Sequence, residues 1–250
     1  GPVATSSAPI SSALFLVAMV WLEASIGPFA FTEANLGARA DAPGDAVQRI
    51  LFVLFVAGLA VKAAMVPLHA WLPAAMVAPA PVSALLHAVA VVKAGAFGIV
   101  RIVFDVFGVE RVAELGLSTP LAVAAAVTIV WGSVRALAQT NLKRRLAYST
   151  VSQLSYIVLG VALAAPLAAV GGLVHIVHQG LMKVTLFFCA GAFAETARAE
   201  EIAELDGLGR RMPLVSVAFS VAALGMIGIP PVAGFVTKWY LGLGGLEAGA

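Results

Sequence analysis

The segment SALLHAVAVVKAGAFGIVRIVF, residues 83–104, holds a lysine, Lys93, at the eleventh of its 22 positions. Its length and apolar composition are typical of a helix that crosses a membrane. About ten residues of helix on either side of Lys93, rising ~1.5 Å each, extend for about 15 Å, which a lysine side chain cannot span. The segment therefore predicts an ammonium group held inside an apolar helix.

The composition of the whole chain supports a membrane location. The 250 residues are 61% hydrophobic and 11% charged, whereas a soluble domain carries about 25% charged residues. Apolar runs of about 20 residues match a hydrocarbon core about 30 Å thick. The net charge of +2 is better explained by membrane orientation than by nucleic acid. We expect an all-α polytopic protein in a lipid bilayer, the bacterial inner or plasma membrane.

We predict about seven crossings in one transmembrane domain over residues 1–250, with residues 1–9 as a non-spanning tail. Prolines at 67, 73, 79, 81, 230 and 231 predict broken helices, because proline removes a backbone donor and clashes with the preceding turn. Lys and Arg in the loops after the second, fourth and sixth crossings favour a cytoplasmic location for that face. The predicted crossings are residues 10–31, 47–66, 83–104, 118–137, 146–163, 167–194 and 214–241.

Four of the five lysines lie within these apolar segments: Lys62, Lys93, Lys183 and Lys238. A charged lysine at the bilayer centre costs roughly 2.5–3.5 kcal/mol on insertion scales. Burial lowers the pKa of an amine, so that lysine, unlike arginine, can exchange its proton at a buried site. The pattern predicts a proton relay. For Lys62, near the end of its segment, the alternative is an ammonium that reaches the interface.

Histidines accompany the lysines. His87 precedes Lys93 on one predicted helix, and His175 and His178 share a helical face one to two turns before Lys183. They extend the predicted relay, although a histidine on an apolar face is also a common core residue. Glu23 is the one acid in a predicted crossing, either a partner for a lysine or a solvated residue at a helix end.

The sequence predicts no catalytic, cofactor-binding or metal site. Cys189 is the single cysteine, which excludes an internal disulfide and the four thiolates of a typical iron–sulfur cluster. No carboxylate or second cysteine accompanies the histidines as a metal ligand. Any redox chemistry would therefore take place on other chains.

The lysine motifs also resemble those of a known family. The sequences KAAMVPLHAWLPAAMVAPAPVSALLHAVAVVKAG (62–95), HQGLMKVTLFFCAGAF (178–193), LDGLGRRMP (205–213) and GIPPVAGFVTKWYL (228–241) are similar to antiporter-like proton-translocating subunits. These include the large membrane subunits of complex I, of membrane-bound hydrogenases and of Mrp-type antiporters. The step from His178 to Lys183 and the GFVTKWYL sequence most resemble the D-type branch of the Mrp subunits.

The resemblance implies an inverted-repeat fold with broken helices and a role for each lysine. Lys62 would pair with an upstream glutamate, Lys93 would pass the proton inward, Lys183 and His178 would connect the path, and Lys238 would open to the far side. Glu23 lies too close in sequence to Lys62 to be that glutamate. We therefore expect a piece of a longer subunit, with a truncated protein or a helix supplied by a partner as the alternatives. Arg135 and residues 143–145 receive no role.

Three functions follow as alternatives. The first is a proton-translocating subunit that works with other membrane subunits, driven by a gradient of Na⁺ or another monovalent cation. The second is a membrane-arm subunit of an NADH:quinone oxidoreductase or a membrane-bound hydrogenase. The third is a truncated, non-transporting scaffold, against which the retention of four costly lysines argues. An independent solute carrier is disfavoured because no feature of the sequence recognises an organic substrate.

Overall fold

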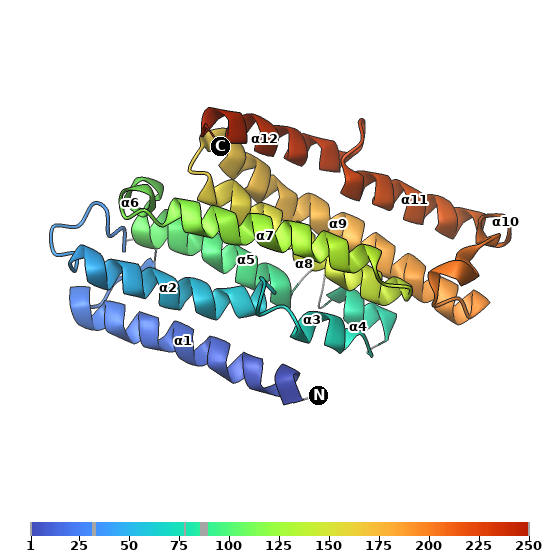
Figure 1. Cartoon of the computed structure of the whole chain (residues 1–250), viewed down its shortest axis with the longest axis horizontal. Coiled ribbons are helices and arrows are strands. Elements are labelled where there is room, and N and C mark those ends of the chain that lie inside the picture. The colour runs from blue at the N-terminus through green and yellow to red at the C-terminus, as the bar shows by residue number, and fades with distance from the viewer. Residues whose placement is uncertain (1, 32–33, 78, 86–89, 250) are drawn as a thin grey trace.

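The computed structural model describes residues 2–31, 34–77, 79–85 and 90–249, and within these residues every regular element is a helix. Long helices run alongside one another through the molecule (Figure 1). The elements are α1 (Pro2–Ile26), α2 (Asp45–Lys62), α3 (Trp71–Ala74), η2 (Ala75–Val77), α4 (Ala80–Ala84), α5 (Val91–Arg101), the π-helix η4 (Ile102–Phe107), α6 (Val109–Glu114), α7 (Ser118–Leu137), α8 (Leu142–Ala162), α9 (Pro166–Ala197), η5 (Ile202–Leu205), α10 (Leu208–Arg211), α11 (Pro213–Ile227) and α12 (Ala233–Glu247).

The helices pack in layers. Helices α1 and α2 lie together on one side, α5, α7 and α8 fill the middle, and α11 and α12 lie on the other side against α9 (Figure 1). A core of aliphatic and aromatic side chains joins α1, α2, α5 and α8. Within it, the Phe15 and Phe55 rings meet edge to face with centroids 5.5 Å apart, as do Phe52 and Phe107 at 5.3 Å.

Large apolar side chains also cover the outside of the bundle, for example on the outer faces of α7 and α11. Among the described residues, Pro9–Ile26 of α1, α7 and α9 are long and apolar enough to cross a membrane by themselves, and α11 is a shorter apolar helix. A membrane-embedded helical protein is thus confirmed, whereas the count of seven crossings stays a prediction. Residues 2–9 form the first turns of helix α1, and the window of that helix that could cross a membrane begins at Pro9.

Two predicted crossings differ from continuous helices. Residues 83–104 are divided among α4, α5 and the beginning of η4, and the connection 86–89 lies outside the described residues. Residues 214–241 are split into α11 and α12 around Pro230 and Pro231, as those prolines predicted. A break removes intrahelical hydrogen bonds, so protein or water must satisfy the freed backbone groups.

The end of α2 shows how the protein satisfies them. The Met65 N–H donates to the Ala60 carbonyl at 3.0 Å and the Ala64 N–H to Val61 at 3.2 Å, which is the Schellman pattern of a helix C-terminus. Ala64 takes the left-handed conformation, with φ 54°. Trp71 Nε1 donates to the Val61 carbonyl at 2.7 Å, so α3 is fastened to the end of α2 beside Lys62.

The loop that joins α9 to α10 is also ordered by local hydrogen bonds. The Glu204 carboxylate accepts the backbone N–H groups of Glu201 at 2.9 Å and Glu200 at 2.8 Å. These two bonds lower the pKa of the Glu204 carboxyl. The Leu142 N–H donates to the Glu200 carbonyl at 2.9 Å, and this bond fixes the loop against the beginning of α8.

Glycines allow the helices to approach backbone to backbone. A Cβ at Gly95 of α5 would collide with the backbone of Lys62 and Ala63, and one at Gly244 of α12 would collide with Ala168 of α9. Small residues at helix contacts are typical of membrane proteins because they permit close packing. The crossing at Gly95 therefore holds α5, the helix of Lys93, directly against the end of α2.

We expect Gly95→Ala to lower the stability of the full-length protein by about 1–3 kcal/mol, because the added methyl group meets backbone that cannot rotate away. Gly242→Ala is the matched control, since a Cβ there has no neighbour within 4 Å. Alanine favours a helix over glycine by about 1 kcal/mol, so the control should be neutral or stabilising. Thermal unfolding in detergent measures both, and equal midpoints would contradict the close crossing.

Candidate functional site

A row of polar side chains runs along the contact between α8 and α9. Ser149, Gln153 and Tyr156 are spaced four and three residues apart on α8, so they share one face of that helix. On α9, the partners Lys183, Gln179 and His175 are each four residues apart and also share a face. Because the two helices run antiparallel, the six residues form three successive pairs along the contact: Ser149 meets Lys183, Tyr156 meets His175, and Gln153 and Gln179 are the residues between them on each helix. We call these six residues the polar ladder.

Lys183 lies at the first pair and is fully buried, with 0% of its surface exposed. Its Nζ donates to the Leu146 carbonyl at 3.0 Å and to Ser149 Oγ. Both acceptors are uncharged oxygen atoms of α8, and no acid in the described residues forms an ion pair with Lys183. The site thus solvates an amine by hydrogen bonds alone, which offsets part of the cost of burial.

The third pair joins α8 and α9 to α12. The rings of Tyr156 and His175 meet edge to face with centroids 5.9 Å apart. Thr237 Oγ1 lies within hydrogen-bond distance of the Gly234 carbonyl at 2.9 Å and of His175 Nδ1 at 3.2 Å, and its hydroxyl can donate to either group or accept from a protonated Nδ1. The other ring nitrogen, Nε2, is buried and has no hydrogen-bond partner within the described protein.

Several buried polar atoms around the middle of the ladder have no hydrogen-bond partner within the described protein. They are His175 Nε2, His178 Nδ1, Gln153 Oε1 and both polar atoms of the Gln179 amide. Buried polar atoms in proteins nearly always have a partner, from protein or ordered water. Five such atoms close together therefore indicate a position where ordered water molecules bind.

Lys238 lies beyond the third pair, on α12, and is half-buried. Its Nζ donates to the carbonyls of Met226 and Ile227 at 2.8 Å each. These are among the last carbonyls of α11, which lack intrahelical partners and carry the negative end of the helix dipole. The ammonium also lies 5.5 Å from the centre of the Tyr156 ring. Tyr156 thus stands between Lys238 and His175.

The other predicted lysines lie toward α2 and α5. Lys93 is half-buried on α5 and, with Lys238 and His178, is close enough to His175 to affect it electrostatically. Lys62 is the last residue of α2 and is exposed on this chain. The structure therefore brings Lys93, Lys183 and Lys238 to the region of α8, α9 and α12 and leaves Lys62 at its margin.

Glu23 and Lys62 are not brought together. Ser11 Oγ donates to the Gly58 carbonyl at 2.5 Å, and Phe15 packs on Phe55, so α1 and α2 run antiparallel with Glu23 level with about residue 47. That register separates Glu23 from Lys62 by about 22 Å along α2. Glu23 is also exposed. The predicted relay member His87 lies outside the described residues.

The sequence-based prediction missed Ser149, Gln153, Tyr156, Gln179 and Thr237. The spacing of His175, Gln179 and Lys183 was a usable signal, because every fourth position of one apolar helix is polar. The residues of α8 that contact this row could not be predicted from spacing, because they depend on which face of α8 packs against α9. Within the described residues, no group of three His, Cys, Asp or Glu side chains could hold a metal ion.

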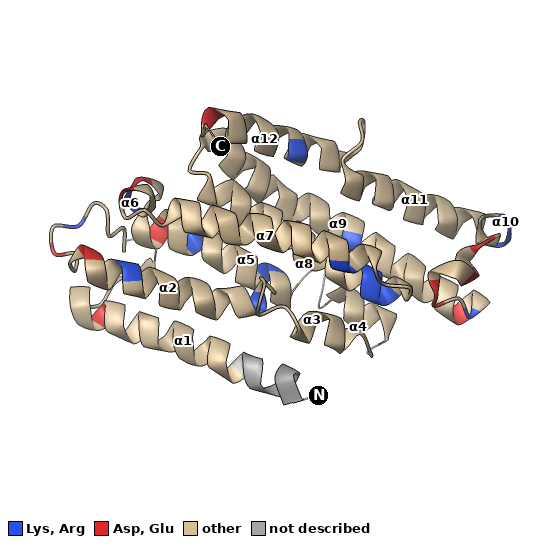
Figure 2. Ribbon diagram, viewed as in Figure 1, with Lys and Arg blue, Asp and Glu red and all other residues tan. Residues whose placement is uncertain are grey.

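Charged residues elsewhere lie mainly at helix ends and loops, and few interrupt the helices (Figure 2). Arg111 at the beginning of α6, for example, binds Asp45 at 2.6 Å and Glu114 at 3.1 Å. Lys183 and Lys238 differ from such pairs because their hydrogen-bond acceptors are uncharged.

Comparison with known proteins identifies relatives over most of the chain. The family described as "NADH:quinone oxidoreductase/Mrp antiporter, TM" matches residues 3–249. The chain is 44% identical over 202 residues to NADH-quinone oxidoreductase subunit N of Desulforudis audaxviator, covering 80% of this chain and 40% of that protein. It is 38% identical over 202 residues to a subunit of a probable K(+)/H(+) antiporter of Rhizobium meliloti, covering 79% and 20%.

Solved structures share the fold. A chain of the Mrp complex from Dietzia sp. superposes with a TM-score of 0.87 at 28% identity, over 99% of this chain and 45% of that one. A chain of the membrane-bound sulfane sulfur reductase, an archaeal respiratory membrane complex, gives 0.85 at 30% identity, over 97% and 49%. This chain thus spans less than half the length of these relatives, and the matches confirm the predicted family resemblance.

The ladder yields a stability test at Gln179. Since neither polar atom of its buried amide has a protein partner, we expect Gln179→Leu to leave the protein as stable or up to about 2 kcal/mol more stable. Gln48→Leu is the control: that buried amide donates to Pro43 at 2.7 Å and accepts from Arg111 at 3.0 Å. We expect the control to lose about 2 kcal/mol. Thermal unfolding measures the stability of both variants. A larger loss of stability for Gln179→Leu than for Gln48→Leu would contradict the absence of a protein partner for the Gln179 amide.

Proposed function

This chain belongs to the NADH:quinone oxidoreductase/Mrp antiporter transmembrane family, and we propose that it conducts protons along the polar ladder between Lys183 and Lys238. The observation that carries the proposal is the fully buried Lys183, whose ammonium contacts only uncharged oxygen atoms. A scaffold would gain stability from an apolar residue there. A functional proton exchange by this amine would explain why the protein retains a lysine despite the free-energy cost of burying it.

The groups of the ladder have the properties that stepwise transfer needs. Lysine can release its proton at a buried site, which arginine cannot do. Next to Lys183, the amides of Gln179 and Gln153 offer donors and acceptors to bridging water. Further along, the imidazole of His175, whose Nε2 has no protein partner, can accept and release a proton. From Lys183 to His175 the ladder covers eight residues, about 12 Å of helix.

Lys238 is the proposed terminal group. Its position at the break between α11 and α12 suits exchange with water, because backbone outside regular helix in a membrane is tolerated where it lines a cavity or is buried in protein. The Met226 and Ile227 carbonyls stabilise the charged amine, and the Tyr156 face attracts a cation. A proton arriving from His175 would therefore be held at Lys238 before it leaves.

The entry side would be formed by Lys93 and Lys62. Lys93 acts electrostatically on His175 and is proposed to pass protons toward the ladder. Lys62 would receive its acidic partner from a segment of the longer subunit, since Glu23 lies about 22 Å away along α2. His87 keeps its predicted role on sequence grounds alone. We also propose that the chain crosses the membrane seven times as a single transmembrane domain, as part of an inverted-repeat arrangement.

The energy source divides the proposal into two versions. The relatives include subunits of a probable K(+)/H(+) antiporter and of an NADH-quinone oxidoreductase, and the structural neighbours come from an Mrp complex and a respiratory complex. A monovalent cation gradient or a redox arm on partner subunits would drive the protons. The D-type branch of the Mrp subunits remains our prediction for this chain. Mass spectrometry of partners that co-purify with the tagged full-length protein would separate the two.

Lys238→Arg separates proton transfer from helix capping. Arginine keeps the positive charge and can donate to the Met226 and Ile227 carbonyls, but it does not release its proton. We expect proton flux in proteoliposomes containing the intact complex to fall by about a hundredfold or more, the scale of a lost acid–base group. Assembly and thermal stability should stay near wild type.

Arg210→Gln is the control for that assay, because Arg210 is exposed at the end of α10 and belongs to no proposed site. Its flux should equal that of the wild type. If Lys238→Arg also conducted protons at the wild-type rate, Lys238 would be a helix cap and not a proton carrier. Lys183→Met, tested in parallel, should abolish flux through the other end of the ladder.

A further inference from the structure

A basic cleft lies where α7 ends and α8 begins, apart from the polar ladder. It has a volume of about 770 Å³, within the range of about 300–1,000 Å³ of ligand pockets. Its walls come from the end of α7, the first turns of α8, the α3–η2 segment and the loop after α9. The residues that line it include Met76, Arg135, Asn141, Lys143, Arg144 and Tyr148.

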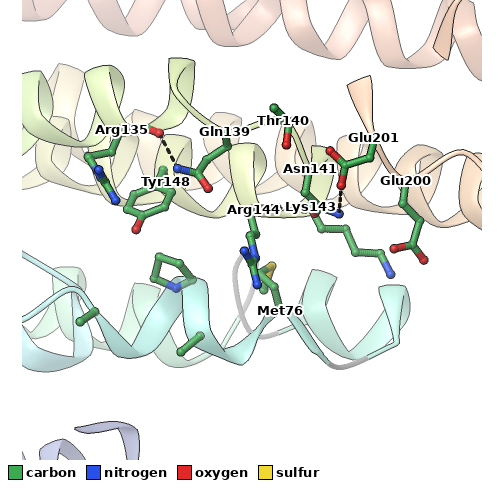
Figure 3. A pocket seen from close by; sticks show the side chains of 13 residues that line it. Met76, Arg135, Gln139, Thr140, Asn141, Lys143, Arg144, Tyr148, Glu200 and Glu201 are labelled. Atoms are coloured by element: carbon green, nitrogen blue, oxygen red, sulfur yellow. Dashed lines mark hydrogen bonds between the residues drawn. The ribbon is translucent and has the colours of Figure 1, made fainter. Parts of the chain in front are cut away.

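Two guanidinium groups enter this cleft from different helices. In Figure 3, the side chains of Arg135 and Arg144 and the hydroxyl of Tyr148 all point into the gap between α8 and the α3–η2 segment. The Arg135 guanidinium lies over the Tyr148 ring, 5.6 Å from its centre, so the ring holds it in place. No ion pair of Arg135 or Arg144 occurs among the described residues.

The acidic residues at the cleft do not neutralise this pair. The Glu201 carboxylate accepts from Asn141 Nδ2 at 3.4 Å and caps η5. Glu200 and Lys143 both line the other end of the cleft (Figure 3). Lys143 and Arg144 also occupy the first turn of α8, where the helix dipole is positive and disfavours cations. An anion between Arg135 and Arg144 would relieve both effects.

An apolar groove lies on the outside of α7, the helix that carries Arg135 into the cleft. It has a volume of about 450 Å³ and is lined by Ala126, Val127, Val130, Trp131 and Val134. Trp131 lies one helical turn before Arg135 and donates from Nε1 to His69 Nε2 at 3.4 Å. Basic side chains, then an aromatic ring, then aliphatic side chains therefore follow one another along α7, the order found from headgroup level into the hydrocarbon of a bilayer.

We propose that this cleft and groove bind an anionic phospholipid, with its phosphate between Arg135 and Arg144 and an acyl chain along Val134, Val130 and Val127. A phosphate accepts hydrogen bonds from two guanidinium groups and from a tyrosine hydroxyl. Basic residues that only set the membrane orientation need to lie on the cytoplasmic side, and their side chains do not need to meet. Here Arg135 and Arg144 come from different helices and line one cleft. The α7–α8 connection is thus an anionic lipid site, independent of the proton path.

The test uses the intact complex, stripped of lipid and then exposed to phosphatidylglycerol, phosphatidylcholine or inorganic phosphate. Native mass spectrometry counts the lipid retained. We expect phosphatidylglycerol to be retained in preference to phosphatidylcholine. Arg135→Gln and Arg144→Gln should each weaken its binding about fivefold, the worth of one basic residue at an anionic surface, and Val130→Trp should weaken it by filling the groove.

Arg210→Gln with Arg211→Gln is the matched control, because these exposed arginines of α10 carry the same charge change away from the cleft. The control should retain phosphatidylglycerol as the wild type does. Equal retention of phosphatidylcholine, unchanged binding in the Arg135→Gln/Arg144→Gln double variant, or inorganic phosphate binding as tightly as the lipid would each overturn the proposal. So would full retention in Val130→Trp, which would place the acyl chain elsewhere.

Discussion

The contact of Lys183 with α8 is the constraint on which the centre of this protein depends. A fully buried ammonium needs acceptors, and here the Leu146 carbonyl and Ser149 Oγ provide them. Those acceptors are available only if α8 and α9 pack closely and in one register. The same register then sets Tyr156 against His175. One buried charge therefore explains why a polar row crosses an apolar bundle.

Close packing in turn depends on residues without side chains. A Cβ at Gly172 of α9 would stand 2.9 Å from the Ile157 carbonyl of α8, and one at Gly171 would stand 3.0 Å from the Thr237 carbonyl of α12. These glycines let α8, α9 and α12 meet where Thr237 reaches His175. The glycine contacts and the polar ladder are thus two aspects of one helix interface, in which the small residues set the distances that the polar groups require.

The broken helices serve the same arrangement. Helix α11 ends at Ile227, and its last carbonyls become the acceptors for Lys238. An unbroken helix would keep those carbonyls in its own hydrogen bonds. At the other break, Trp71 and the Schellman bonds hold the end of α2 beside Gly95. The break after α11 thus places Lys238 next to carbonyls that a continuous helix would not expose.

The sequence by itself determined the helical membrane fold, the family and the candidate lysines, because apolar runs, prolines and isolated charges are local features of the chain. It also contained the His175–Gln179–Lys183 spacing. Only the tertiary structure decided that Ser149, Gln153 and Tyr156 face that row, that Lys62 is exposed on this chain, and that Glu23 lies far from it. Those outcomes depend on helix register and contact faces, which arise from packing between segments distant in sequence.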